Sequence, residues 1–166
     1  MLLIDIPIGK IESVLKHRIQ LVEIVVKHTT YQKTALDSQI YELRKHGPRY
    51  FLFNHELKSI FSPNGVYIFV IRSWEPGVIY CAPINSIGGH TSMTRYTPSV
   101  IGSVHFAGEL LFENGYLKRW TNGSGHYQPE AELARTNLLP HVSLMLPDNL
   151  FTPTQAPGRG LGYKNL

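Results

Sequence analysis

A chain of 166 residues with 43% hydrophobic and 17% charged residues fits one globular domain with a single core. Its net charge of +4 is mild, and its basic residues are spread along the chain rather than gathered in a run, which argues against nucleic acid as a partner. The single cysteine excludes an internal disulfide and a metal site built on paired cysteines.

The N-terminal part predicts helices. The first ten residues, MLLIDIPIGK, lack the basic region and long apolar core of a signal peptide, and no apolar run is long enough to span a bilayer. Residues 9–28 place apolar side chains mostly on one side at helical spacing, although the β-branched residues of VEIVV lower the helix propensity. Residues 35–46 predict a second helix, which ends at Gly47-Pro48 after a basic last turn.

From residue 49 the hydrophobic period changes to that of strands. Short β-rich runs alternate with turn sequences, and the clearest case is residues 104–120, where Asn114-Gly115 predicts the type I′ turn of a hairpin. The expected register pairs Phe112 with Leu117 and Leu110 with Arg119. It also puts two groups of side chains on opposite faces: Phe106, Leu110, Phe112 and Leu117 toward the core, and Glu109, Leu111, Lys118 and Trp120 away from it.

After this hairpin, Pro129 can begin a short helix over residues 130–139. The order of elements predicts an α+β fold: two N-terminal helices, then a mostly antiparallel sheet built as a meander with hairpins, a short helix and an irregular C-terminal tail. We therefore divide one compact domain into an N-terminal helical segment (1–48), a β-rich core (49–150) and a flexible tail (151–166).

Five ordered pieces of residues 66–133 resemble a known type of module. They are an IFV strand, His90-Thr91-Ser92, Ala107-Gly108, Asn114-Gly115, and Ser124-Gly125-His126-Tyr127 with Pro129. The block is similar to the core of plant IQ-motif calmodulin-binding proteins. It is also similar to SGHYxP-containing modules at the C-termini of bacterial polymorphic and insecticidal-complex toxins and in secreted effectors. Thr91 departs from the Ser of those families, and the segment between His90 and Ala107 is longer than theirs.

The resemblance implies a setting rather than a reaction. It implies a bacterial effector or toxin module, made in the cytoplasm and delivered into another cell by a dedicated secretion system. A protein of the target cell is then the expected substrate, and an immunity or chaperone protein is a further candidate partner. Calmodulin binding does not carry over, because IQLVEIVVK in the first predicted helix lacks the basic residues that an IQ motif needs after Ile-Gln.

Two histidines and their neighbours are the first candidate site. His90 and His126 lie at the ends of predicted strands or turns, where each could act as a general base or could fix a loop through a backbone carbonyl. Tyr127 could stack on nicotinamide or adenine, or could be buried under the hairpin. Ser92 could be a nucleophile, although no Gly-x-Ser-x-Gly sequence surrounds it. Cys81, in the strand-like run VIYCAP, is a weaker candidate nucleophile.

A second pattern is the order Arg72, then Thr91-Ser92, then Glu109, which resembles that of ADP-ribosyltransferase toxins. There the arginine pairs with the pyrophosphate of NAD, and the glutamate stabilises the oxocarbenium-like ribose. An alternative arrangement has His90 on the ribose, Tyr127 on nicotinamide, and Glu130 or Glu132 as the carboxylate. The eight histidines are scattered without metal-ligand spacing, so no metal is predicted.

These patterns leave two hypotheses. The first is an NAD-dependent ADP-ribosyltransferase with a cleft lined by His90, Ser92, His126 and Tyr127. It assigns catalysis to His90, Ser92, His126 and Glu109 and cofactor binding to Arg72, Thr91 and Tyr127. The second is a non-enzymatic protein-binding module in which the His-Tyr corner is structural.

Overall fold

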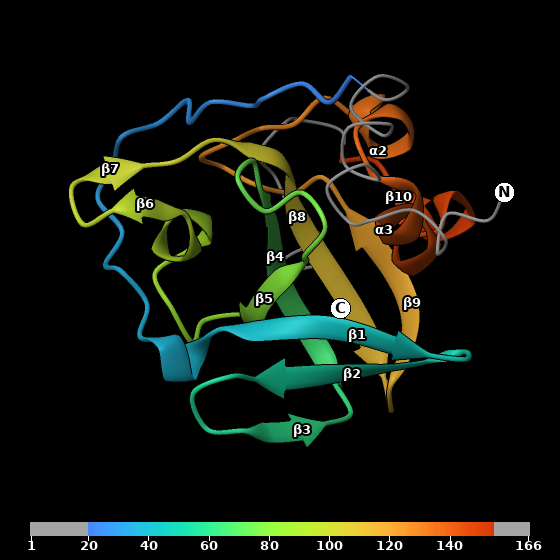
Figure 1. The fold of residues 1–166 in the computed structure, drawn as a ribbon. Coiled ribbons are helices and arrows are strands. Elements are labelled where there is room, and N and C mark those ends of the chain that lie inside the picture. Colours follow the sequence, from blue (N-terminus) through green and yellow to red (C-terminus); the bar gives the residue numbers. More distant parts are fainter. Residues whose placement is uncertain (1–19, 155–166) are drawn as a thin grey trace, which may run out of the picture.

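The computed structural model describes residues 20–154, which form a mostly β fold (Figure 1). The strands are β1 (Tyr41–His46), β2 (Arg49–Asn54), β3 (Ser59–Phe61), β4 (Gly65–Arg72), β5 (Tyr80–Pro83), β6 (Arg95–Thr97), β7 (Val100–Ile101), β8 (Val104–Glu113), β9 (Tyr116–Thr121) and β10 (Phe151–Thr152). The helices are α2 (Leu133–Thr136) and α3 (Pro140–Met145), with 3-10 turns η2 (Asp37–Gln39), η3 (His90–Met93) and η4 (Asp148–Leu150). Within the described range no helix has the length and hydropathy needed to cross a membrane.

Eight strands form one curved sheet in the order β10-β9-β8-β4-β5-β1-β2-β3, and β6 pairs with β7 beside it. Neighbours in the large sheet are antiparallel, except that β10 runs parallel to β9. Figure 1 shows β1, β2 and β3 crossing the long β4–β8 pair. The backbone N–H of Tyr50 donates to the carbonyl of Gly115 at 2.7 Å. The sheet therefore curls until β2 meets the turn after β8.

The two central strands, β4 and β8, are buried on both faces, because each face carries its own apolar cluster. Phe69 of β4 belongs to the larger cluster, and the next residue, Val70, belongs to the smaller one. Helices α2 and α3 lie over the larger cluster through Ala134 and Val142, and Leu138 and Leu146, which follow the two helices, join them there. The smaller cluster takes in residues from segments outside the large sheet: Ile24, Met93 and Tyr127.

The prediction of an α+β fold led by two helices is wrong, because the described residues hold only two short helices and a large sheet. Residues 35–46 form η2 and β1 instead of a helix. Gly47-Pro48, predicted to end a helix, is the two-residue loop between β1 and β2, and Gly47 has the positive φ of 58° that such loops use. A basic strand end followed by Gly-Pro is therefore indistinguishable locally from a helix end.

Residues 20–28 of the first predicted helix are extended, and residues 9–19 lie outside the described residues. Ile24 exchanges two backbone hydrogen bonds with Val104 of β8, at 2.7 and 3.0 Å. Burial follows a period of two, since Ile24 is buried, Val25 is exposed and Val26 is partly buried. The β-branched residues that lowered the helix propensity favour this extended form.

The predicted hairpin is confirmed as β8 and β9, with Asn114 and Gly115 at the turn and Phe112 opposite Leu117. A bulge between Leu111 and Phe112 then shifts the register, so that Leu110 faces Trp120 instead of Arg119. Trp120, predicted to face away from the core, is fully buried in it. The same shift sets Glu109 opposite Thr121, and Glu109, also predicted to face away from the core, is buried.

The region that we assigned to the tail begins with β10, which pairs with β9 at Trp120 and Thr121. Residues 155–166 lie outside the described residues. The predicted helix after Pro129 is present in a shorter form, as α2.

Candidate functional site

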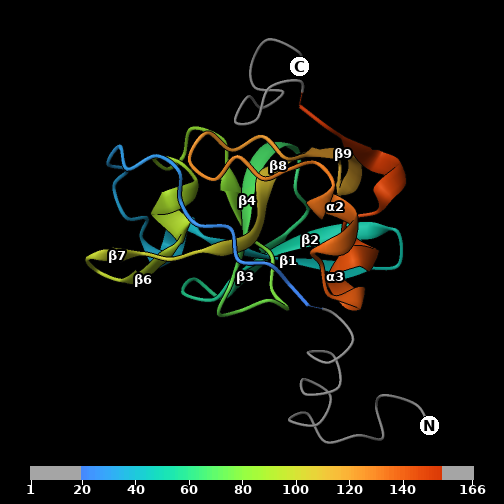
Figure 2. The same cartoon turned by 90° about the horizontal axis from the view of Figure 1, so that it is seen from above.

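The candidate site is the face of the sheet that carries His90–Ser92 and Ser124–Tyr127. Residues 20–35, which we call the cover segment, run over this face as an extended chain. Figure 2 shows the cover segment, in blue, crossing the molecule from the side of α2 and α3 toward β6 and β7. Both motifs therefore lie beneath a segment of the same chain, and their contacts divide between the sheet and that segment.

His90 is a buried, neutral hydrogen-bond donor. Its side chain is 7% exposed, and Nε2 donates to the carbonyl oxygen of Gly108 at 2.9 Å. Gly108 lies one residue beyond the last β8–β9 pair, Glu109 and Thr121. Burial lowers the pKa of His90 to about 4, against an opposing effect of this hydrogen bond, and nearby His126 lowers it further. Such an imidazole holds the middle of β8, just past the point where β9 ends, and is poorly matched to general-base chemistry near neutral pH.

Tyr127 is also turned inward. Its ring is completely buried, its hydroxyl donates to the carbonyl of Gly102 at 2.7 Å, and Oγ1 of Thr94 lies 2.6 Å away. Burial raises the pKa of the phenol to about 12. Tyr127 therefore ties the chain on both sides of the β6–β7 hairpin to the sheet and presents no ring face for stacking.

Replacing Tyr127 by phenylalanine is expected to lower the free energy of unfolding by about 2 kcal/mol. The change removes one hydroxyl but leaves the carbonyl of Gly102 and the hydroxyl of Thr94 short of a partner in a buried place. Urea denaturation measures the loss. Tyr96→Phe, at an exposed ring, is the control and should change stability by less than about 0.5 kcal/mol. Equal effects of the two changes would contradict the structural role of Tyr127.

His126 faces the cover segment. Its Nε2 donates to the carbonyl of Thr30 at 3.0 Å, and its own carbonyl accepts from the N–H of Lys27 at 2.7 Å. The turn that presents it is closed locally, because Ser124 Oγ accepts the backbone N–H of Tyr127. His126 lowers the pKa of His90, yet His90 bonds to the sheet and His126 bonds to the cover segment.

Thr91 and Ser92 likewise meet the cover segment. The backbone N–H and the hydroxyl of Thr91 both donate to Oε1 of Gln32, at 3.0 and 2.6 Å. The carbonyl of Ser92 accepts the N–H of Ala35 at 3.0 Å. The hydroxyl of Ser92 is buried and has no hydrogen-bond partner among residues 20–154. The neighbouring His90, which could have activated this hydroxyl as a nucleophile, bonds instead to the carbonyl of Gly108.

The structure does not bring Arg72 and Glu109 together. Arg72 donates to the carbonyl of Met93 at 2.7 Å and forms an ion pair with Glu75 at 3.0 Å. Glu109 is buried and accepts a hydrogen bond from the hydroxyl of Thr121 at 3.2 Å. The residue opposite Glu109 on β4 is Ile68, four positions before Arg72, so the two backbones are roughly 13 Å apart at 3.3 Å per residue.

The remaining sequence candidates lie apart from these groups. Cys81 is fully buried in β5, and burial raises the pKa of its thiol. Glu130 and Glu132 are exposed just before α2. In residues 20–154 no three His, Cys, Asp or Glu side chains are gathered so that they could hold a metal ion.

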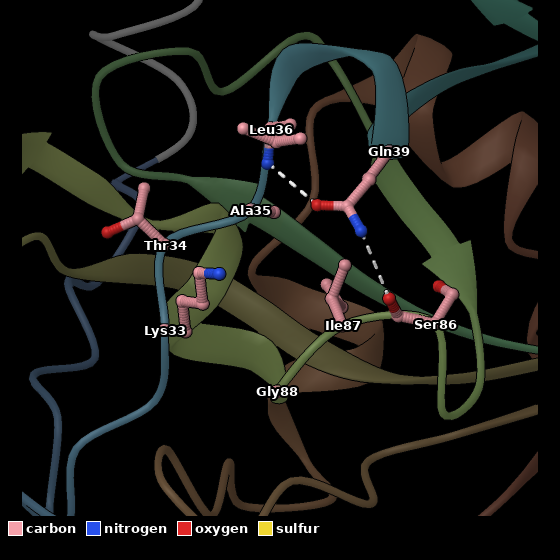
Figure 3. A pocket seen from close by; sticks show the side chains of 8 residues that line it. All are labelled: Lys33, Thr34, Ala35, Leu36, Gln39, Ser86, Ile87 and Gly88. Atoms are coloured by element: carbon pink, nitrogen blue, oxygen red, sulfur yellow. Dashed lines mark hydrogen bonds between the residues drawn. The ribbon is translucent and has the colours of Figure 1, made fainter.

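A hollow of about 270 Å³ opens where the cover segment ends. Its lining, drawn in Figure 3, is Lys33, Thr34, Ala35, Leu36, Gln39, Ser86, Ile87 and Gly88. The side chain of Gln39 spans it, accepting the N–H of Leu36 and donating to the carbonyl of Ser86. None of the four residues predicted to line a cleft is among these eight.

Several residues of this face were missed in the sequence. Gln32 contacts Thr91 across 59 positions, and Arg95 contacts Gln32 across 63. Asn137 holds Val22 from 115 positions away, through hydrogen bonds to its N–H and its carbonyl. No local pattern marks such residues, because each is defined by a partner that only the fold brings near.

Comparison with known protein families, with curated proteins and with solved structures finds no match to this chain. The assignment of function therefore depends on the geometry of this face.

Proposed function

We propose that this protein is a non-enzymatic binding module whose motif-bearing face holds an extended polypeptide segment. The observation that carries the proposal is a common arrangement of the two motifs. His90 and Tyr127 turn inward and bond to backbone carbonyls of the fold. Their neighbours in the chain, Thr91 and His126, bond to the cover segment. Each motif thus combines one residue that bonds to the fold with one that binds the extended segment.

The cover segment is held as proteins hold a bound peptide. Backbone hydrogen bonds join Ile24 to Val104, Lys27 to His126, and Ala35 to Ser92. At its start, the side-chain amide of Asn137 accepts a hydrogen bond from the N–H of Val22 and donates one to the carbonyl of Val22. Peptides that add to a sheet gain affinity from such backbone bonds and specificity from individual side chains.

The proposed occupant is an extended segment of a partner protein, which replaces residues 20–35 on the same contacts. Exchange is supported by the apolar side chains of the cover segment, because Ile24 alone is buried, whereas Val22, Val25 and Tyr31 are exposed. Its other apolar side chains are only partly buried: Leu21, Val26 and Ala35. In the effector or toxin setting that the resemblance predicts, the partner is a target-cell protein, an immunity protein or a chaperone. Delivery into another cell by a secretion system belongs to this proposal.

A labelled peptide of residues 20–36 tests the proposal on the full-length chain. Ile24→Asp puts a charge where a buried side chain pairs with β8, so it should release the cover segment and free the face. Fluorescence anisotropy should then show the peptide binding at least about tenfold more tightly to this variant than to the wild type, whose face is already filled.

Val25→Asp is the matched control, because it places the same charge on the next residue, which is 66% exposed. This variant should bind the peptide no better than the wild type does. Circular dichroism establishes that both variants are folded. A folded Ile24→Asp chain that ignores the peptide would show that the face does not accept a polypeptide supplied from outside.

NAD-dependent ADP-ribosyl transfer is the second candidate, with His90, Ser92, His126 and Glu109 for catalysis and Arg72, Thr91 and Tyr127 for NAD. One observation favours it: Thr91 holds a primary carboxamide, the group that nicotinamide carries. It ranks second because His90 and Tyr127, to which it gives roles in catalysis and NAD binding, are buried and bond to backbone carbonyls.

A further inference from the structure

The side-chain carboxamide of Gln32 is held by the loop before β6. Two donors of Thr91, the backbone N–H and the hydroxyl, converge on one oxygen of the Gln32 carboxamide. Two donors on one carbonyl oxygen use both of its lone pairs. The Gln32 side chain is therefore bound as a ligand is bound, by its functional group.

The loop is shaped around this amide. A Cβ atom at Gly89 would lie 2.1 Å from Nε2 of Gln32 and 2.5 Å from its carbonyl carbon, closer than real atoms approach. A residue with a side chain could keep that position only by expelling the amide. Glycine at this position thus leaves the space that a flat carboxamide fills.

Two unpartnered polar atoms flank the same contact. In the part of the chain that the structure describes, the buried side-chain N and O atoms without a hydrogen-bond partner are Ser92 Oγ and Arg95 Nε. Ser92 directly follows Thr91, and Arg95 donates through Nη2 to the backbone carbonyl of Gln32 at 2.7 Å. Buried polar atoms are seldom left unpaired, because each costs about 1–3 kcal/mol. Gln32 therefore leaves polar groups beside this contact unsatisfied.

The 270 Å³ hollow adjoins this contact. Gly88 lines the hollow, and a Cβ atom built on it would lie 3.0 Å from Ser92 Oγ and 3.4 Å from the backbone nitrogen of Lys33. Figure 3 shows Gly88 and Lys33 close together in the lining of the hollow. A ligand larger than one amide group has room here for its remaining atoms.

We propose that Gly88, Gly89, Thr91 and Ser92, with Arg95 beside them, form a binding site for a primary carboxamide, and that Gln32 occupies it as an internal substitute for the ligand. The assignment rests on the proposed function, since the ligand replaces part of the cover segment. The carboxamide belongs either to a glutamine of the partner's segment or to a small molecule such as nicotinamide. Ser92 Oγ and the guanidinium of Arg95 are then available to the rest of the ligand.

Chemical rescue tests the site without any peptide. Gln32→Ala in the full-length chain deletes the atoms that acetamide can restore, so acetamide should raise the melting temperature of this variant. A rise of about 3 °C is expected when the amide is at about ten times its dissociation constant. Acetate, which has the same shape but a negative charge, should have a smaller effect.

Gln39→Ala is the matched control, because Gln39 is a glutamine of the same region that bonds to Leu36 and Ser86 rather than to Thr91. Acetamide should leave this control and the wild type unchanged. An equal rise in all three proteins, or no rise in a folded Gln32→Ala chain, would overturn the carboxamide site.

If Gln32→Ala does not fold, Gln32→Glu replaces it. That variant should melt well below Gln39→Glu, and equal melting would overturn the site.

Two ligands then distinguish the sources of the amide on the Gln32→Ala chain. A peptide of residues 28–36 that contains Gln32 should bind at least about tenfold more tightly than the same peptide with alanine there. Equal binding of the two peptides would retain the peptide face but overturn the carboxamide site. Binding of nicotinamide over nicotinic acid, with neither peptide bound, would retain the site while removing the proposed polypeptide partner.

Discussion

Replacing Gly108 by alanine is expected to lower the free energy of unfolding by at least about 4 kcal/mol, the largest effect of any single change considered for this fold. A Cβ atom at Gly108 would lie 1.8 Å from the carbonyl oxygen of Thr121 and 2.8 Å from its carbonyl carbon. Both atoms belong to the backbone where β9 ends, so no side-chain rotation relieves the clash. Either β8 or β9 must shift, and both pack into the larger core.

Urea denaturation, or the yield of folded protein if the variant does not fold, measures this loss. Gly77→Ala is the control. Its new Cβ would lie 3.1 Å from the side chain of His141, which is exposed and can move away. That change should alter stability by less than about 1 kcal/mol. A Gly108→Ala chain as stable as the wild type would mean that β8 and β9 do not approach as described.

Stability is expected to fall by roughly 3 kcal/mol on account of His90 as the pH drops from about 6.5 to about 4. In the unfolded chain the imidazole takes up its proton near pH 6.5, whereas burial keeps it neutral in the folded chain until about pH 4. Between these values the unfolded state binds more protons. The contribution of His90 is therefore complete above pH 6.5 and is lost as the pH falls toward 4.

The measurement is the free energy of unfolding of the wild type and of His90→Gln, by urea at a series of pH values from 7 to 4. Glutamine retains an N–H donor but does not titrate in this range. The remaining histidines and the carboxylates contribute to both proteins, so the difference between the two curves isolates His90. Parallel curves would contradict a buried neutral imidazole and would reopen its assignment as a catalytic base.

The turn and pairing chemistry of the β8–β9 hairpin was predictable from the sequence alone. Asn114-Gly115 accepts the positive φ that a tight hairpin requires, and the pairing of Phe112 with Leu117 follows from that turn. Beyond Leu111 the same reasoning failed, because a bulge adds one residue on the β9 side. A bulge depends on how two strands pack within a sheet, and the sequence of either strand alone does not predict that packing.

The first predicted helix failed for a related reason. Residues 20–28 carry apolar side chains at spacings that suit either a helix or an extended strand, and local propensity does not choose between them. The choice is made by Val104, 80 positions away, whose backbone groups pair with those of Ile24. A backbone partner at that distance outweighs a weak local preference.

The candidate site was likewise predictable from the sequence only in part. The sequence marked His90, Thr91, Ser92, His126 and Tyr127 by their places in turns and by their resemblance to a known module, and all five lie on or under one face of the sheet. The sequence did not predict whether each side chain turns toward the core or toward the cover segment. That is set by which carbonyl lies within reach: Gly108 for His90, and Thr30 for His126.

The sequence by itself determined where the chain turns, which strands of the central hairpin pair, and which residue types gather in the two motifs, since these follow from backbone geometry and local spacing. The tertiary structure decided which polar groups meet. Gln32 reaches Thr91, and His90 reaches Gly108, only because the curved sheet and the cover segment bring distant residues within hydrogen-bond distance. Hydrogen bonds act over about 3 Å, so their partners are settled by the fold.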